Sequence, residues 1–412
     1  MKLKTYLKGA ALVAMATFLA ACGNTASGGK TEIEFFSQKP EMQATLQEIV
    51  DDYNKSQDDV TVKLTSVPDA GKVLKTRISN GEAPDVINIY PQNADFKGWA
   101  ADGQFVDLTS EKEILNQLND GAAQTYAVND KIYNIPLTTN VSGIYYNKDA
   151  FKKLGIEVPK TLAEFQEIVA KIKADGQTPF AEALGDAWTF NGYAQLAWIQ
   201  SAGSAKAAND YLRFSSKGAI SASDKVTKNV GAYLDLLAGN GQKNSDGALY
   251  ADTVAAFASG DALMMANGSW ALPVIKQQNP NFEVGFFAMP GLTSDAPAMT
   301  VGAADMAVSI SAESKNVNAA KDFVKYLSSA KAMQKYYDVD GSPTAVKGVE
   351  TEGKFKEIAD VAALAFTDQQ AVWLQSEWTS EETFWNANVS YIKSKDLTAY
   401  TEALNTFFDT MK

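Results

Sequence analysis

The feature that most constrains the fold of this chain is a regular alternation of strand-like and helix-like segments over its first ninety residues. Five segments follow in turn: strand-like Thr31–Ser37, helix-like Pro40–Tyr53, strand-like Val60–Leu64, helix-like Val73–Ser79 and strand-like Val86–Tyr90. Apolar residues alternate or run continuously in the strand segments and recur at helical spacing between them. This order predicts a parallel sheet with helices packed against it, an α/β arrangement.

The rest of the chain repeats the change between strand-rich and helix-rich stretches. Strands are predicted at Lys131–Pro136, Ser142–Asn147, Gly285–Met289 and Ala304–Ile310, and largely helical stretches at 176–270, 315–338 and 354–412. Thr161 and Glu164 form a Thr-x-x-Glu capping box at the start of a further helix. A chain that crosses more than once between two lobes produces this pattern.

We therefore predict two lobes that face each other across a cleft. The first lobe is predicted to contain residues 31–139 plus 284–328, and the second residues 140–283 plus 329–412. The short segment 138–141 is the expected first crossing. Because ligands of open α/β sheets bind at the carboxyl ends of strands, a ligand is expected between the lobes.

The first residues of the chain resemble those of an exported precursor. Lys2, Lys4 and Lys8 precede the apolar run Gly9–Ala21, which ends in small residues. The run is shorter than the roughly 20 residues of a membrane span. Leu19–Cys22 resembles the bacterial lipobox, in which the cysteine is lipidated and becomes the mature N-terminus.

We expect residues 1–21 to be a lipoprotein signal peptide, Cys22 to carry the lipid, and 22–30 to be a flexible tether. An ordinary signal peptide with a cysteine nearby by chance is the alternative. The predicted location is extracytoplasmic, on the outer face of the cell membrane, held there by the lipid on Cys22.

The composition excludes several classes of function. The formal charge is −12, and −15 without Lys2, Lys4 and Lys8, which argues against a nucleic-acid partner. The chain has no histidine and one cysteine, so a Ser-His-Asp triad, an HExxH zinc site and an intrachain disulfide are all impossible. We predict no catalytic residue, no metal and no cofactor.

The remaining composition favours an uncharged ligand. Arg77 and Arg213 are the only arginines, and arginine is the usual partner of phosphate and carboxylate ligands. Seven tryptophans, sixteen tyrosines and twenty phenylalanines leave some aromatic residues beyond the needs of the core. Sugars, which have apolar C–H faces and hydroxyl rims, fit a cleft with aromatic and polar walls.

Several segments in this order resemble one protein family. They are APDVINIYP ending at Pro91, KIYNIP ending at Pro136, IYYNKDAF ending at Phe151, PKTLAEF ending at Phe165 and Gly268–Trp270. The chain is similar, over nearly its whole length, to the carbohydrate-binding lipoproteins of bacterial ABC importers, the family 1 extracellular solute-binding proteins. The resemblance implies a two-lobed, periplasmic-binding-protein-like α/β fold with several hinge crossings.

Further segments resemble the raffinose and α-galactoside binders of streptococci within that family. They include Gln38-Lys39, VGAADM ending at Met306, YYDVDGSPT ending at Thr344, and AFTDQQAVWLQSE ending at Glu377. The resemblance implies ligand-binding roles for Lys39, Asn88, Trp270, Asp305, Phe366 and Asp368. Gln369 stands where some relatives have histidine, so the sugar bound here can differ. A Gram-positive cell is also implied.

Three more residues are candidates for the cleft, each with a simpler alternative. Trp188 and Trp373 are candidates for stacking on a sugar ring, although core packing is the commoner fate of aromatic residues. Glu41 is a candidate hydrogen-bond acceptor, although a helix dipole alone explains an acid in a first turn. For each of the other candidates the simpler alternative is a position without a binding role, in a turn, at the end of a strand or on the solvated surface.

The sequence therefore predicts a monomeric receptor that closes on an oligosaccharide of raffinose or α-galactoside type and docks on the ABC permease. Malto- or fructo-oligosaccharides are alternative ligands in the same role. A remote alternative is an exported glycosidase using Glu377, Glu381 or Glu382, since such enzymes need only paired carboxylates. A binder of another ligand, such as a peptide or a metal, is a third reading that the composition disfavours.

Overall fold

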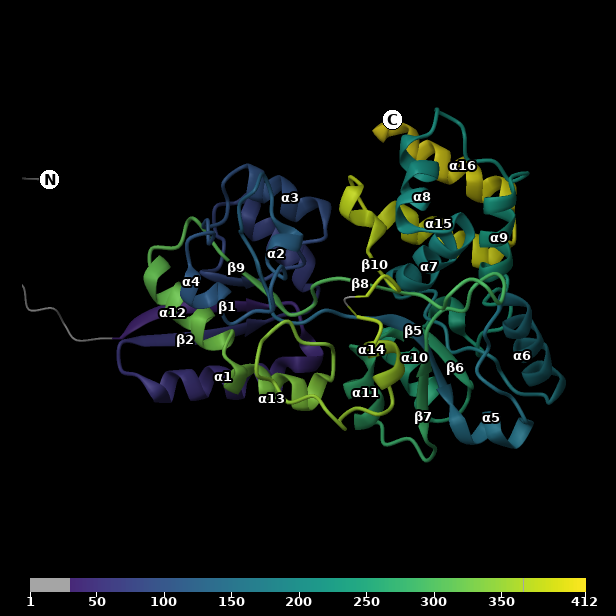
Figure 1. Ribbon diagram of the computed structural model, residues 1–412, viewed down its shortest axis with the longest axis horizontal. Helices are drawn as coiled ribbons and strands as arrows, with labels where there is room; N and C mark the ends of the chain where they lie inside the picture. The colour runs from purple at the N-terminus through teal and green to yellow at the C-terminus, as the bar shows by residue number, and fades with distance from the viewer. Residues whose placement is uncertain (1–29, 366) are drawn as a thin grey trace, which may run out of the picture.

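The computed structural model describes residues 30–365 and 367–412, which form two lobes joined by extended segments (Figure 1). The first lobe, at the left of the view, is built on a five-stranded sheet in the order β2-β1-β3-β9-β4. Its strands are β1 (Thr31–Ser37), β2 (Val60–Ser66), β3 (Val86–Asn88), β4 (Ile135–Pro136) and β9 (Ala307–Ile310). The predicted parallel pairing of β1 with β2 and β3 is confirmed, whereas β9 runs antiparallel to both β3 and β4.

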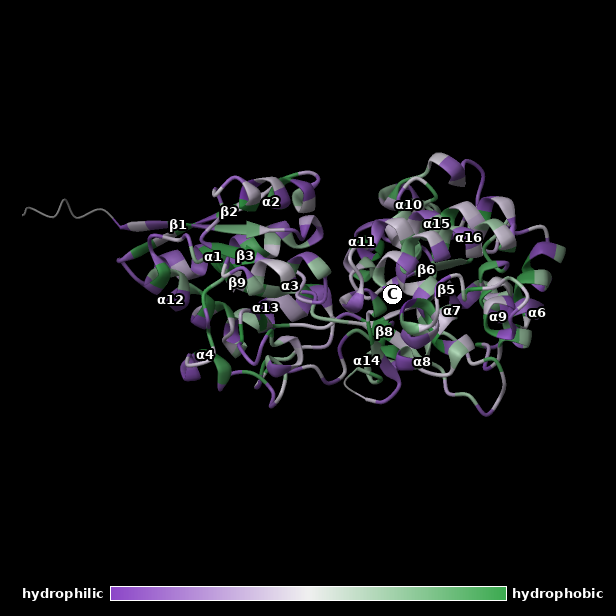
Figure 2. Ribbon diagram, turned by 90° about the horizontal axis from the view of Figure 1, so that it is seen from above, coloured by the Kyte–Doolittle hydropathy of each residue, from purple (hydrophilic) through white to green (hydrophobic). Residues whose placement is uncertain are grey.

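Helices cover both faces of this first sheet. They are α1 (Gln43–Ser56), α2 (Ala70–Ser79), α3 (Ala94–Ala101), α4 (Lys112–Leu115), α12 (Val317–Leu327) and α13 (Ala330–Asp340), with short 3-10 turns η1 (Pro40–Met42) and η2 (Gln124–Tyr126). Side chains alternate across a strand, so Phe35 packs into the core with α1, α12 and α13, and Phe36 into the core with α2 and α3. The result is three layers, with the apolar strands in the middle (Figure 2).

The second lobe is built on an antiparallel sheet in the order β6-β5-β7. Its strands are β5 (Ser142–Asn147), β6 (Met264–Gly268) and β7 (Val284–Phe287), and β8 (Thr300–Gly302) pairs in parallel with β10 (Gln370–Val372) beside them. The helices are α5 (Lys148–Leu154), α6 (Leu162–Ala174), α7 (Asn191–Ala202), α8 (Ala205–Asn209), α9 (Lys225–Leu234), α10 (Tyr250–Ala258), α11 (Ala271–Gln277), α14 (Ala359–Ala362), α15 (Glu382–Ser394) and α16 (Leu397–Phe408). Shorter turns are η3 (Ala187–Phe190), η4 (Asp210–Phe214, a π-helix), η5 (Ser245–Gly247), η6 (Leu374–Glu377) and η7 (Asp409–Met411).

Three extended segments lie side by side where the lobes meet. Thr139 pairs with Ala304, and Thr138 pairs with Thr344, both antiparallel. The chain crosses near residues 137–141 and 302–306, and residues 341–345 lie beside these segments before Val346 returns to the core of the first lobe; we call the three segments the hinge. The predicted crossing at 138–141 is confirmed, and the hinge brings residues from three distant parts of the sequence together.

The strand pairing corrects two boundaries of the predicted lobes. Residues from 284 were expected in the first lobe, but β7 pairs with β5 in the second sheet. Residues from 329 were expected in the second lobe, but Met333 and Tyr336 of α13 are buried in the core of the first. These predictions were wrong because no local pattern marks where a chain crosses between two lobes.

Three strands, β6, β8 and β10, were missed, and several others are shorter than predicted. β6 and β10 lie within stretches predicted to be helical, because a short buried apolar run does not distinguish strand from helix. The strand predicted at Lys131–Pro136 is reduced to β4. In the part of the chain that the structure describes, no helix has the length and apolar character needed to cross a bilayer. Cys22 and the predicted signal peptide lie outside the described residues.

Candidate ligand-binding site

A cavity of about 890 Å³ lies between the two lobes, beside the hinge. The first lobe lines it with residues after β1 and β3, including Lys39, Glu41, Tyr90 and Gln92. The second lobe contributes mainly aromatic and amide side chains, and the hinge contributes Asn140 and Asp305. The volume is within the range of roughly 300–1,000 Å³ typical of small-molecule sites.

Three charged residues form the floor of this cavity. Lys39 follows β1 and precedes Pro40, where the chain turns into η1, and Asp305 lies on the hinge before β9. The Nζ atom of Lys39 lies 2.7 Å from Oδ2 of Asp305 and 2.7 Å from Oε1 of Glu41. The side chains of Lys39 and Asp305 are only 3% and 5% exposed.

Electrostatics keep this floor charged. Burial alone would lower the pKa of Lys39, but the adjacent carboxylates of Asp305 and Glu41 outweigh it and raise that pKa well above its usual value. Lys39 is therefore an ammonium group that holds both carboxylates in place. Each carboxylate keeps lone pairs with which to accept hydrogen bonds from ligand hydroxyl groups.

Asn88, a predicted ligand contact, lies behind the floor and does not line the cavity. Its side-chain oxygen accepts from the backbone N–H of Gln38 at 3.1 Å, and its amide nitrogen donates to the carbonyl of Ala307 at 3.0 Å. It is fully buried. Asn88 therefore braces the two backbone segments that carry Lys39 and Asp305.

The second lobe supplies aromatic walls. Trp188, Trp270, Trp373 and Trp385 all line the cavity, as does Tyr250, whose ring lies 5.2 Å from that of Trp188. Aromatic faces of this kind suit the apolar C–H faces of sugar rings.

Six residues of the cavity carry buried polar atoms that have no hydrogen-bond partner within the described part of the chain. These atoms are Gln92 Oε1, Ser142 Oγ, Tyr250 Oη, Asn267 Nδ2, Trp270 Nε1 and Trp385 Nε1. Buried polar groups in folded proteins are nearly always paired. A hydroxyl-rich ligand in the cavity would offer both donors and acceptors to this set.

The lobes contact each other at the edge of the cavity, which we call its mouth, through residues that follow the lining residues Phe96 and Gln375 in the sequence. Lys97 of α3 donates from Nζ to the carbonyl of Ser376 at 2.5 Å and lies 3.3 Å from Oε1 of Glu377. The other oxygen of Glu377 accepts from Arg213 of the second lobe at 3.1 Å. Glu377 therefore bridges a cation of each lobe.

A second charged group lies nearby at the mouth. Lys75 and Asp95 of the first lobe form an ion pair of 2.6 Å, and both line the cavity with Glu381. Burial raises the pKa of Glu381, and nearby Lys75 partly offsets that effect.

The structure brings together most, but not all, of the residues predicted from the sequence. Lys39, Glu41, Trp188, Trp270, Asp305 and Trp373 line the cavity. Asp368 is exposed and does not line it, and the side-chain nitrogen of Gln369 donates to the carbonyl of Ala298 at 2.9 Å. Phe366 lies outside the described residues.

Other cavity residues were not found from the sequence. They include Tyr90, Gln92, Asn140, Ser142, Tyr250, Asn267 and Trp385. Weak signals existed for two of them: Asn140 lies in the predicted crossing segment, and Asn267 directly precedes Gly268–Trp270. The others are polar or aromatic residues that only the packing of the lobes places at the cavity.

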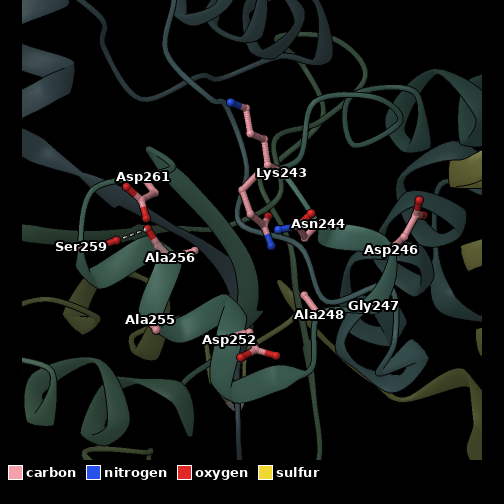
Figure 3. Close-up of a pocket in the computed structure, with 11 residues that line it drawn as sticks. Lys243, Asn244, Asp246, Gly247, Ala248, Asp252, Ala255, Ala256, Ser259 and Asp261 are labelled. Atoms are coloured by element: carbon pink, nitrogen blue, oxygen red, sulfur yellow. Dashed lines mark hydrogen bonds between the residues drawn. The ribbon is translucent and has the colours of Figure 1, made fainter.

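A further pocket, of about 960 Å³, lies on the second lobe. Figure 3 shows that Lys243, Asp246, Asp252 and Asp261 point in different directions around it. Asp252 accepts from the backbone N–H of Leu249, and Asp246 pairs with Lys393, so two of these carboxylates already have partners. Over the described residues, no group of three or more Asp, Glu, Cys or His side chains is suited to a metal ion.

Two lobes, a three-segment hinge and a cavity beside it together define a ligand receptor. The family profile of the bacterial extracellular solute-binding proteins matches residues 37–334. A multiple sugar-binding protein of Streptococcus mutans is 52% identical over 400 residues, covering 96% of this chain and 94% of the relative. The chain belongs to the bacterial extracellular solute-binding proteins, as its motifs predicted.

Solved structures agree with this assignment. The solute-binding protein RafE in complex with raffinose is 48% identical, with a TM-score of 0.90 over 93% of this chain and 100% of that one. The apo form of RafE from Streptococcus pneumoniae is 47% identical, with a TM-score of 0.82 over 93% of this chain and 98% of that one. At nearly equal identity, the structure as a whole is thus more similar to the raffinose complex than to the apo form.

Proposed function

We propose that this protein captures a neutral oligosaccharide of raffinose or α-galactoside type between its lobes and delivers it to a membrane permease. The observation that carries the proposal is the cavity itself. It joins a buried Lys39–Glu41–Asp305 floor, tryptophan walls and six unpaired polar atoms. The S. mutans relative is a multiple sugar-binding protein and RafE is in complex with raffinose, which supports the same ligand class.

The charge of the cavity favours a neutral ligand. Its charged lining residues are Lys39, Lys72 and Lys75 against Glu41, Asp69, Asp95, Asp305, Glu381 and Glu382. Carboxylates outnumber ammonium groups by six to three, and neither arginine lines the cavity. A phosphorylated or acidic sugar would be repelled by this excess of negative charge.

Closure of the two lobes is sufficient to capture the sugar, and no covalent bond has to form or break. A hydrogen bond between a hydroxyl and a carboxylate contributes about 1.5–3 kcal/mol net, and micromolar affinity requires about 8 kcal/mol. Two such bonds, several neutral ones and a stacked ring together reach this value. The sugar contacts both lobes, so it stabilises the closed state over the open one.

No step of this function requires catalysis. Glu377, one of the carboxylates considered for a glycosidase, is held by Lys97 and Arg213 at the mouth. Asp305 and Glu41 are both ion-paired with the ammonium of Lys39. We propose a binding protein that is anchored through Cys22 outside the cytoplasm of a Gram-positive cell and acts as a monomer.

A ligand panel tests this function. Thermal unfolding of the purified protein is measured with raffinose, stachyose, melibiose, maltotriose, a fructo-oligosaccharide and sn-glycerol 3-phosphate. A ligand that binds the folded state raises Tm, and at a fixed ligand concentration the shift grows with the logarithm of the affinity. The proposal predicts a shift with raffinose or stachyose, none with the phosphate, and no free monosaccharide by chromatography. Shifts with maltotriose or the fructo-oligosaccharide alone would replace the proposed ligand, and released monosaccharide would show catalysis.

A further inference from the structure

Gly268, the last residue of β6, occupies a position where a side chain has no room. A Cβ atom placed on it would lie 1.9 Å from Cζ3, 2.2 Å from Cη2 and 2.4 Å from Cε3 of the Trp270 indole. The φ angle of Gly268 is not in the left-handed region, so its backbone would accept other residues. Glycine is therefore required at position 268 because a larger residue would collide with the ring of Trp270.

A side chain at position 268 of β6 would face the cavity. Gly268 pairs directly with Ser142 of β5 in the antiparallel sheet. Side chains of directly opposed residues lie on the same face, and Ser142 lines the cavity. The indole of Trp270 thus folds back over the position where the side chain of residue 268 would stand.

Trp270 is held firmly on its other sides. It packs against two hydrophobic cores of the second lobe, one containing Phe165 and Phe287 and the other containing Tyr145 and Phe286. Its Nε1 atom is buried and has no partner within the described residues. Because the cores resist compression, a methyl group at position 268 would displace the ring toward the cavity rather than into the lobe.

We infer that Gly268 is a positioning residue for sugar binding: its missing side chain sets where the indole of Trp270 forms the wall of the cavity. This inference rests on the proposed function, since it concerns the same cavity. It assigns a role in ligand affinity to a residue that has no side chain to contact the ligand.

The test measures raffinose affinity by calorimetry for the full protein and for Gly268→Ala, with Tm from thermal unfolding. We expect Gly268→Ala to weaken binding by about tenfold or more. The same substitution is then made in a Trp270→Phe background. Phenylalanine lacks the outer ring atoms that approach residue 268, so there we expect Gly268→Ala to cost less than about threefold.

Gly285→Ala is the matched control. A Cβ at Gly285 of β7 would lie 2.3 Å from Cε1 of Tyr146, a similar collision with an aromatic ring in the same sheet. Neither Gly285 nor Tyr146 lines the cavity. This variant should lower Tm while leaving raffinose affinity within about twofold.

The outcomes separate the inference from the proposed function. If the unmodified protein binds no sugar, the proposed function fails, and the inference fails with it. If the protein binds raffinose but Gly268→Ala binds equally well, the inference alone is wrong. An equal loss in the Trp and Phe backgrounds would also overturn it, because a general defect in β6 does not depend on the ring at position 270.

Discussion

The ammonium of Lys39 lies 2.7 Å from the carboxylate of Asp305, although 266 positions separate them in the sequence. The first residue follows the opening strand of the first lobe, and the second lies on the hinge. The contact therefore joins the floor of the cavity to the segment about which the lobes move. A ligand that binds Lys39 and Asp305 therefore lies beside the hinge about which the two lobes close.

Asp305→Asn tests the role of this pair. The variant loses a charged acceptor for sugar hydroxyls and leaves Lys39 with Glu41 as its one carboxylate contact. We expect raffinose binding to weaken by about 100-fold and the free energy of unfolding to fall by about 3 kcal/mol. Calorimetry and denaturant titration measure the two effects. Asp338→Asn, at a surface carboxylate paired with Lys354, is the control, and an equal loss of affinity there would refute a specific role for Asp305.

Lys97→Met tests the contact at the mouth of the cavity. The variant keeps the aliphatic chain but loses the bonds from α3 to Ser376 and Glu377, which connect the lobes. These contacts are partly exposed, so we expect raffinose affinity to fall by about two- to fivefold, mainly through faster dissociation. Stopped-flow release at low and high salt measures this change. Lys63→Met removes a similarly exposed ion pair within the first lobe, with Glu32, and should have no effect on release.

Asn88→Ala tests whether a residue behind the floor acts on the site. The variant loses bonds to Gln38 and Ala307; the N–H of Gln38 is left unpaired, whereas the carbonyl of Ala307 keeps its bond from the N–H of Ile89. We expect the free energy of unfolding to fall by about 2–3 kcal/mol and raffinose affinity to fall because Lys39 and Asp305 shift. Asn54, which braces Val62 through two similar bonds away from the cavity, is the control. Asn54→Ala should lower stability alone; a matching loss of affinity in it would contradict the proposed role.

The buried carboxyl group of Glu182 makes the free energy of unfolding depend on pH. Burial, with a smaller contribution from Asp246, raises the pKa of Glu182 to about 8. Between its ordinary pKa and about pH 8, the folded state keeps a proton that the unfolded state has released. The free energy of unfolding therefore falls as pH rises through this window, by about 1.4 kcal/mol per pH unit.

Glu182→Gln removes this titration, so the variant should gain stability relative to the wild type as pH rises from 5 to 8. Denaturant titrations at pH 5, 6, 7 and 8 measure the difference. Glu402→Gln, at an exposed position of α16, is the comparison and should follow the wild type. A constant difference between Glu182→Gln and the wild type across this range would show that Glu182 does not titrate there.

The sequence predicts the parts of the fold that depend on local pattern. β5 was predicted with its observed bounds, Ser142–Asn147, around the strand-favouring residues Ile144, Tyr145 and Tyr146. The N-cap of α6 forms as expected, with Thr161 accepting from the N–H of Glu164, but Glu164 accepts from the N–H of Lys160 rather than from that of Thr161, so the predicted capping box is incomplete. Strand order was harder, because the antiparallel pairing of β9 with β3 joins segments more than 200 residues apart.

The residues of the cavity also fall into those that the sequence revealed and those that only the packing of the lobes places there. Lys39 and Asp305 were found because they lie in sequence motifs that resemble those of the sugar-binding family. Tyr250 and Trp385 were missed because their place at the cavity depends on how the second lobe packs. Asn88 was expected at the cavity because of the family resemblance, whereas its side chain bonds behind the floor to Gln38, to Ala307 and to the hinge residue Asp305.

The most direct test of the central claim is calorimetric titration of the protein with raffinose, repeated with Asp305→Asn. We expect saturable heat with one site per chain and micromolar affinity, which Asp305→Asn weakens by about 100-fold. The absence of heat with raffinose, stachyose and melibiose, or binding that Asp305→Asn leaves unchanged, would contradict the claim.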